Sequence, residues 1–162
     1  MYRFVCIFVV VFSLLAISGC DKMKRAVDAT ARLAAQVNNL QTQIEKSYDD
    51  KLIDRATALK LTHLVKDELN PAVASYIDFV AKLSKTYPPG ARPKPADWAT
   101  VSALFRVVED AFQKILVMVG SLSQERSALI SIAIDALVEI MDVIHGAVAE
   151  ADRYLLSEVR YA

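Results

Sequence analysis

The side chains of this sequence best suited to chemistry are two histidines and the carboxylates near them. Asp67 follows His63 by four residues, and Asp142 precedes His145 by three. Residues with these spacings share one face of a helix, so each histidine is expected to lie beside a carboxylate. Asp142 and His145 would form half of a metal site, whose other ligands would come from other helices. Because the sequence has no Glu-x-x-His motif and no second copy of the Asp142 pattern, we expect a solvated polar face and no metal.

The remaining carboxylates do not form a catalytic pair. Three pairs are adjacent in sequence, at 49–50, 67–68 and 109–110. Neighbouring residues on a helix point about 100° apart, so these pairs do not converge as an acid–base dyad would. The sequence also has no glycine-rich phosphate loop and no serine-centred nucleophile elbow. We therefore expect no enzymatic activity, no catalytic residue and no cofactor.

One of the two cysteines, Cys20, ends a distinctive N-terminal segment. Arg3 gives the start of the chain one positive charge, and residues 4–17 carry no charge. This stretch suits the apolar region of an export signal but is short for a membrane-spanning helix, which needs roughly 20 residues. Two small residues, Ser18 and Gly19, separate it from Cys20, and charged residues follow at once.

The segment Ile17-Ser18-Gly19-Cys20 resembles the lipobox of bacterial lipoproteins, in which an aliphatic residue and two small residues precede a cysteine. The resemblance covers only the first twenty-odd residues. It implies that residues 1–19 are a signal peptide cleaved before Cys20, that the Cys20 thiol carries a diacylglyceryl group, and that the new amine is often acylated. The alternative is an uncleaved N-terminal anchor helix.

The resemblance also implies where the protein is located. Two or three acyl chains on one cysteine make membrane anchoring effectively permanent. We therefore expect the lipid on Cys20 to hold the protein at the cell membrane, facing the periplasm or the cell exterior. In enterobacterial lipoproteins an aspartate directly after the lipidated cysteine disfavours transfer to the outer membrane. Asp21 fits this sorting pattern, so the inner membrane is favoured if the source is Gram-negative.

The composition from Cys20 to Ala162 indicates one helical domain. These 143 residues suffice for a single domain, and Cys20 is their only cysteine. Over the whole sequence, 19 Lys and Arg residues balance 19 Asp and Glu residues, which does not suggest a nucleic-acid partner. Abundant alanine and only four glycines are typical of an all-α protein.

Apolar residues at spacings of three and four predict four long helices, at about 22–48, 54–86, 97–120 and 123–160. A proline-rich linker at 87–96 joins the second and third. We expect an antiparallel, up-down four-helix bundle over residues 20–162, preceded by a cleaved signal helix. The clearest apolar seam belongs to the third helix: Trp98, Val101, Phe105, Val108, Phe112, Ile115, Val119 and Leu122. The fourth helix has a wider apolar face, with one seam at Ile130, Ala133, Leu137, Ile140, Ile144, Ala147, Ala151 and Tyr154 and a neighbouring row at Ile134, Met141, Val148 and Leu155.

Several residues are predicted to begin or interrupt these helices. Asp54 is suited to cap the second helix and Asp97 the third. Residues 121–124 resemble a capping box for the fourth. Pro71 either kinks a continuous second helix or begins a new one capped by Asn70. The kink is favoured because the apolar register passes through Pro71 unbroken.

These features predict a membrane-anchored envelope lipoprotein whose helical bundle binds or scaffolds an envelope protein without catalysis. One alternative is a small-molecule or lipid carrier with a cavity beneath the wide apolar face of the fourth helix. Another is a self-protection lipoprotein that confers phage exclusion or toxin immunity, an analogy based on size and anchor alone. The seam of the third helix can pair within the chain or across a homo-oligomer, and the sequence does not decide between these.

Overall fold

The computed structural model describes residues 27–87 and 93–160, with side chains as far as Ala149. No strand occurs in this part of the chain, so the expected all-α class is confirmed. The elements are a helix over residues 27–49, which we call the N-terminal helix, then α2 (Arg55–His63), the π-helical turn η1 (Leu64–Leu69), α3 (Asn70–Thr86), α4 (Pro95–Gly120) and α5 (Gln124–Arg160).

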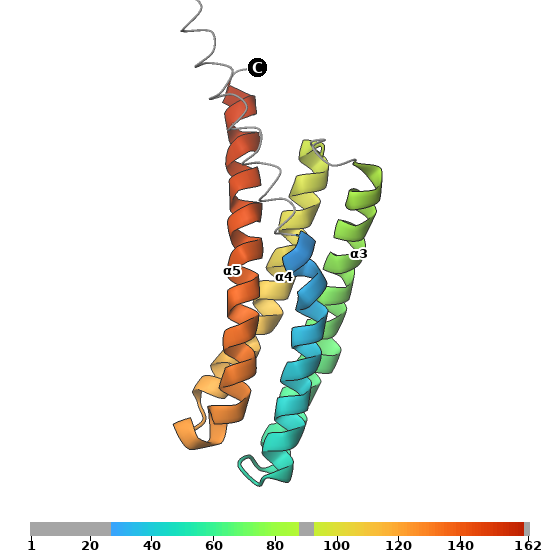
Figure 1. The fold of residues 1–162 in the computed structure, drawn as a ribbon. Helices are drawn as coiled ribbons and strands as arrows, with labels where there is room; N and C mark the ends of the chain where they lie inside the picture. Colours follow the sequence, from blue (N-terminus) through green and yellow to red (C-terminus); the bar gives the residue numbers. More distant parts are fainter. Residues whose placement is uncertain (1–26, 88–92, 161–162) are drawn as a thin grey trace, which may run out of the picture.

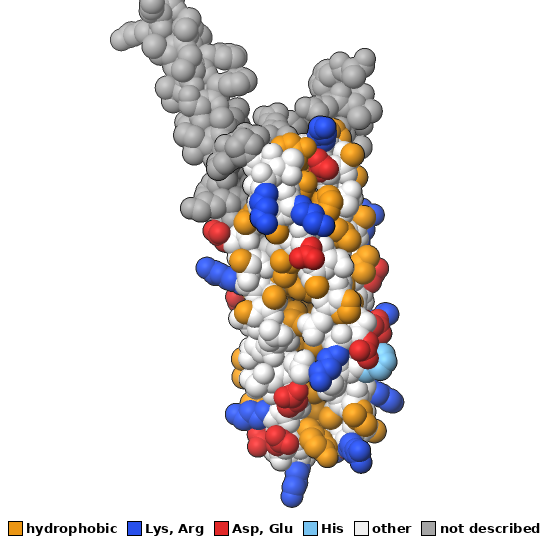
Figure 2. Space-filling view, turned by 90° about the vertical axis from the view of Figure 1, so that its right-hand side faces the viewer, with side chains coloured by type: hydrophobic (Ala, Val, Ile, Leu, Met, Phe, Trp, Pro, Cys, Tyr) orange, Lys and Arg blue, Asp and Glu red, His pale blue; other side chains and the backbone are white. Residues whose placement is uncertain are grey.

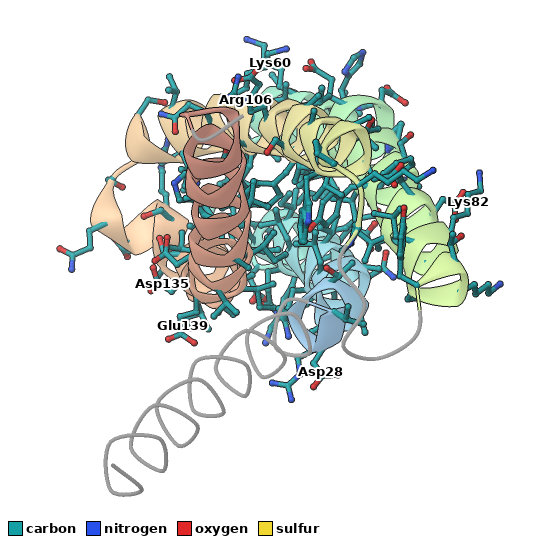
Figure 3. All side chains as sticks on the ribbon, turned by 90° about the horizontal axis from the view of Figure 1, so that it is seen from above. Asp28, Lys60, Lys82, Arg106, Asp135 and Glu139 are labelled. Atoms are coloured by element: carbon teal, nitrogen blue, oxygen red, sulfur yellow. The ribbon has the colours of Figure 1, made fainter. Side chains whose placement is uncertain are left out.

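The N-terminal helix, the stretch from α2 to α3, α4 and α5 lie side by side, and each of these four runs in the opposite direction to the one before it (Figure 1). Elements α2, η1 and α3 follow one another without a break and form a single long rod. This rod packs against α4, and α4 packs against α5. Seen from above, the N-terminal helix lies opposite α4, with α5 on one side and α3 on the other (Figure 3). Turns 50–54 and 121–123 share one end of the molecule, while residue 27 and the connection between α3 and α4 lie toward the other (Figure 1).

One apolar core runs between the helices, and every described helix contributes buried side chains to it. The N-terminal helix buries Leu33, Val37, Leu40 and Ile44. Tyr76 of α3 and Phe105 of α4 are the largest fully buried side chains, and their ring centroids lie 5.5 Å apart. The remaining seam residues of α4 between Val101 and Val119 are also buried, as predicted.

The buried face of α5 differs in part from the predicted seam. Ile130, Leu137 and Ile144 are buried as expected, but Ile140 and Ala147 are only half-buried. The predicted neighbouring row is buried at Ile134, Met141 and Val148, and the half-buried Ile140 packs against the core. The predicted positions of Ala151, Tyr154 and Leu155 lie beyond the described side chains. A wide apolar face offers two overlapping seams, and the contacts with neighbouring helices select between them.

The chain passes through Pro71 as one continuous helix. Asn70 has right-handed helical backbone angles and its N–H donates to the carbonyl of Val65, so it does not cap a new helix. The turn before the proline is π-helical, with bonds reaching back five residues rather than four. Leu61, Val65 and Leu69 are spaced four residues apart, and in a regular α-helix this spacing would rotate each side chain farther from the buried face. The π-helical turn holds more residues, so all three side chains stay buried.

The helix ends confirm one predicted cap and correct two. The Asp54 carboxylate accepts the Thr57 N–H at 2.8 Å and caps α2 as predicted. The assignment of Asp97 was wrong, because α4 begins at Pro95 and places Asp97 inside its first turn. Pro95 is well suited to this position, since its fixed φ fits a helix and its missing N–H would have no partner there. Ser121 does not open α5 either: it ends α4, and its hydroxyl donates to the Met118 carbonyl.

Candidate functional site

The residues predicted to carry the lipid anchor lie outside the described part of the chain. These are the lipobox, Ile17 to Cys20, and the sorting residue Asp21. The described chain begins at residue 27, near the end of the molecule where α3 meets α4 (Figure 1). The turns at 50–54 and 121–123 therefore lie toward the opposite end of the molecule from residue 27.

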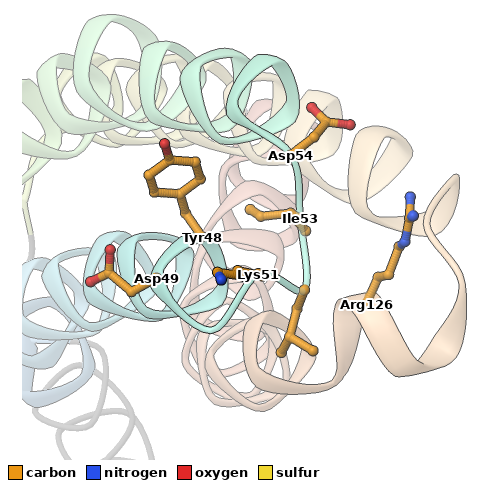
Figure 4. A pocket seen from close by; sticks show the side chains of 7 residues that line it. Tyr48, Asp49, Lys51, Ile53, Asp54 and Arg126 are labelled. Atoms are coloured by element: carbon orange, nitrogen blue, oxygen red, sulfur yellow. The ribbon is translucent and has the colours of Figure 1, made fainter.

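An open hollow of about 480 Å³ lies at that opposite end (Figure 4). Its lining combines cationic, anionic, aromatic and aliphatic groups and comes from Tyr48, Asp49, Lys51, Leu52, Ile53, Asp54 and Arg126. Ile53 is a buried member of the core, whereas Lys51 and Arg126 are exposed. The hollow therefore has an apolar floor and a rim of mixed charge, with no pair of groups converging for acid–base chemistry.

Asp54 has a structural role at the rim of this hollow. Hydrogen bonds from Thr57 to its carboxylate hold its pKa below the usual value, and the Arg126 charge acts in the same direction. These bonds stabilise the ionised form, which is the form that caps a helix. A carboxylate held in this state is a poor proton donor at neutral pH.

Lys51 forms the other side of the hollow with a left-handed backbone, φ 59°. Its N–H donates to the Tyr48 carbonyl at 3.0 Å, and the Leu52 N–H donates to the Ser47 carbonyl at 2.9 Å. These bonds satisfy carbonyls at the end of the N-terminal helix, as a left-handed C-terminal cap commonly does. The left-handed conformation of Lys51 was not predicted, because glycine is the usual residue in such a cap.

The two histidines make different contacts. His145 Nδ1 lies 2.8 Å from Glu109 Oε1 of α4, and its ring is 6.4 Å from Phe105. His145 therefore joins α5 to α4 rather than forming the predicted pair with Asp142. His63 Nε2 lies 3.5 Å from Asp67 Oδ2 on the surface, as its spacing predicted. No group of three or more potential metal ligands occurs among the described residues.

A tyrosine joins the two sides of the proline-rich connection. The Tyr87 hydroxyl donates to Asp97 Oδ2 at 2.6 Å and accepts the Lys94 N–H at 3.3 Å. The bond to the Asp97 carboxylate raises the Tyr87 pKa, because it favours the protonated phenol. No local sequence pattern predicts this contact, because Tyr87 and Asp97 lie at the ends of different helices, ten positions apart. Asp97 thus holds α3 to α4 instead of capping a helix.

Other polar groups join or support the helices. Lys114 of α4 forms an ion pair with Glu68 of η1. Burial raises the Tyr76 pKa, while a hydrogen bond with Thr30 acts against this shift. Within the described residues, every buried side-chain nitrogen or oxygen has a hydrogen-bond partner. The interior polar groups are therefore accounted for by the fold itself.

Along the described stretches 27–87 and 93–160, no helix is both long and apolar enough to cross a membrane. No protein-family model matches the chain, and neither does any curated protein or solved structure.

Proposed function

We propose that the chain is a membrane-anchored bacterial envelope lipoprotein whose helical domain binds or scaffolds another envelope protein without catalysis. The observation that carries this proposal is the order of residues at the N-terminus: an uncharged stretch, then Ile17-Ser18-Gly19-Cys20, then a charged segment beginning at Asp21. Cys20 is the acyl acceptor, and Asp21 favours retention at the inner membrane in a Gram-negative cell.

The mature domain in this proposal is an antiparallel, up-down four-helix bundle. Support comes from the single apolar core, to which every described helix contributes, and from the packing of the continuous α2–α3 rod on α4 and of α4 on α5. Short turns at 50–54 and 121–123 suit antiparallel neighbours. Such a scaffold presents whole helix faces to a partner.

The side-chain contacts favour binding over catalysis. Asp54 caps α2, Asp97 joins α3 to α4 through Tyr87, and His145 is paired with Glu109. The hollow at the far end has a mixed rim and is open to solvent. For the carrier alternative, the wide apolar face of α5 remains the sole argument, because this hollow lies at the end of the helices and not between them.

Replacement of the acyl acceptor tests the proposal. We expect Cys20→Ser to abolish acylation and processing at this site, because serine has no thiol to carry the diacylglyceryl group. Mass spectrometry of the protein purified from membranes would show the full-length mass without lipid. Cys6→Ser is the matched control and should give the same acylated mature mass as the parent, because residue 6 leaves with the signal. If Cys20→Ser were still acylated and cut to the same mature size, the proposal would be wrong.

A further inference from the structure

Three lysines lie where α3 ends and α4 begins. Lys82 and Lys85 belong to the last two turns of α3, and Lys94 directly precedes the first residue of α4. All three side chains are exposed, and none forms an ion pair within the described residues. Figure 2 shows cationic side chains close to this end of the molecule on the α3 side, as well as farther along it. We call the three residues the corner lysines.

A hydrogen-bonded tyrosine holds the two segments that carry these lysines together. The Tyr87 hydroxyl accepts the Lys94 N–H and donates to the Asp97 carboxylate. The end of α3 is thereby joined to the start of α4, so the corner lysines belong to one connected surface. Asp97 is the one carboxylate in residues 80–87 and 93–100, against three lysines.

The opposite end of the molecule has no such excess of positive charge. Residues 45–55 and 121–126, which surround the two short turns, contain five carboxylates and four Lys or Arg residues. At the corner, Asp78 lies one turn before Lys82 and reduces the excess, without forming an ion pair within the described residues. Of the two ends, the one nearer residue 27 is therefore the more cationic in the part of the chain that the structure describes.

The segment between Cys20 and the described domain is short. Seven residue steps separate Cys20 from residue 27, and an extended chain covers at most about 25 Å in seven steps. The N-terminal helix and the α2–α3 rod meet at the turn 50–54, but the first has 23 residues and the second 32. At 1.5 Å per residue, the end of α3 lies about 10 Å or more beyond residue 27 (Figure 1). An anchor at Cys20 therefore keeps this end within about 15 Å of the membrane when the bundle stands upright.

We propose that the corner lysines dock on anionic phospholipid headgroups of the membrane that holds the lipid on Cys20. The inference rests on the proposed function for this anchor. Each lysine near an anionic surface favours the docked state about fivefold. Because α5 also continues past residue 27 (Figure 1), the corner meets a flat surface when the bundle tilts toward α3. The connecting segment contains Lys22, Lys24 and Arg25, which are attracted to the same surface whichever way the domain tilts. A test of the docking must therefore change the corner alone.

Energy transfer from Trp98, the only tryptophan, measures how close the corner lies to the membrane. Its backbone N–H donates to the Lys94 carbonyl, so Trp98 is one turn from a corner lysine. The full lipidated chain is placed in vesicles of phosphatidylcholine, alone or mixed with phosphatidylglycerol, and both contain a small fraction of dansyl-labelled headgroups. We expect stronger transfer with phosphatidylglycerol. High salt should remove this increase, because it screens the attraction.

Charge reversal at the corner should also remove the increase. Lys85→Glu with Lys94→Glu replaces two attractions by two repulsions and should lower the ratio of docked to undocked chains about 25-fold or more. Lys85→Gln with Lys94→Gln should give a smaller loss, because it removes the attraction without adding repulsion. Lys46→Glu with Lys60→Glu is the matched control: it makes the same change of charge at exposed positions nearer the opposite end and should keep the increase.

The outcomes separate the docking from the anchor. Equal transfer in the two kinds of vesicle, or an undiminished increase after charge reversal at the corner, would overturn the docking. Equal loss in the matched control would also overturn it, since net charge and not the corner would then be responsible. The mass of the same sample reports acylation at Cys20. A chain without the lipid mass contradicts the proposed function, whereas a lipidated chain with equal transfer in both vesicles contradicts only the docking.

Discussion

At the scale of single residues, Lys51 shows how a turn constrains the helix before it. Its left-handed backbone allows the chain to leave the N-terminal helix and reach Ile53, which is buried in the core. A side chain with a Cβ is strained in this conformation, whereas glycine adopts it freely. The cap is thus formed by backbone hydrogen bonds and not by the lysine side chain.

Lys51→Gly should raise the free energy of unfolding by about 0.5–1 kcal/mol, because it relieves left-handed strain while the backbone bonds remain. Chemical denaturation of the two proteins measures the difference. Lys51→Ala is the control, since alanine removes the charged side chain but keeps the Cβ. It should be no more stable than the parent, and an equal gain from alanine would show that the lysine charge, not the backbone, is responsible.

The predicted caps had different outcomes, and Asp54 and Asp97 show the contrast. Asp54 caps α2 through a bond to Thr57, three residues away. Asp97 has a similar sequence context, but its partner Tyr87 lies across the proline-rich connection. Capping preferences depend on the first turn of a helix and contain no information about a neighbouring helix. Asp97 lies inside the first turn of α4 because the helix begins at Pro95, and its carboxylate accepts the Tyr87 hydroxyl instead of capping the helix.

At the scale of elements, apolar periodicity predicted the helices well and their exact faces less well. The seam of α4 follows its spacing because one narrow row of large residues is available to bury. The predicted face of α5 is wider and has two rows: Met141 and Val148 of the second row are buried, whereas Ile140 and Ala147 of the first are half-buried. The π turn η1 was not predicted. The sequence feature that could have indicated it is the spacing of four residues, twice in succession, between the apolar residues from Leu61 to Leu69, directly before Pro71.

The α4 seam can be tested by comparing two apolar residues on opposite faces of this helix. Phe105 is 1% exposed and contacts Tyr76, whereas Val107 is 53% exposed. Phe105→Ala should lower the free energy of unfolding by about 3–5 kcal/mol, because it leaves a cavity in the core. Val107→Ala should change it by about 0.5 kcal/mol or less. Urea denaturation monitored by circular dichroism gives both values, and similar losses would contradict the assigned burial.

At the scale of the whole molecule, residue 27 lies toward the end opposite the turns at 50–54 and 121–123, so we expect that end to face the membrane if Cys20 is lipidated. Trp98, the only tryptophan, lies in the first part of α4 near that end. Tyr48 lies beside the hollow at the other end. The two are separated by most of the length of α4, about 30 Å at 1.5 Å per residue.

Quenching by spin-labelled lipid headgroups should therefore be stronger for Trp98 than for a tryptophan at the far end. The comparison protein carries Trp98→Phe with Tyr48→Trp, so each sample has one indole. Fluorescence of the lipidated proteins in the same vesicles measures the difference, and soluble iodide checks that the far indole is accessible. Stronger quenching at position 48 would show that the hollow faces the membrane and would reverse the orientation we infer.

The short turns at 50–54 and 121–123 also bear on how rapidly the chain can reach its folded form. Each turn joins helices that are consecutive in sequence, so much of the packing is between neighbours in the chain. Folds dominated by such local contacts assemble rapidly, since little loop entropy is lost before contacts form. Residues 21–162 contain no cysteine, so no disulfide has to form or rearrange. If the chain is exported unfolded, as proposed, its core can form soon after it emerges, helix pair by helix pair, without an oxidising catalyst.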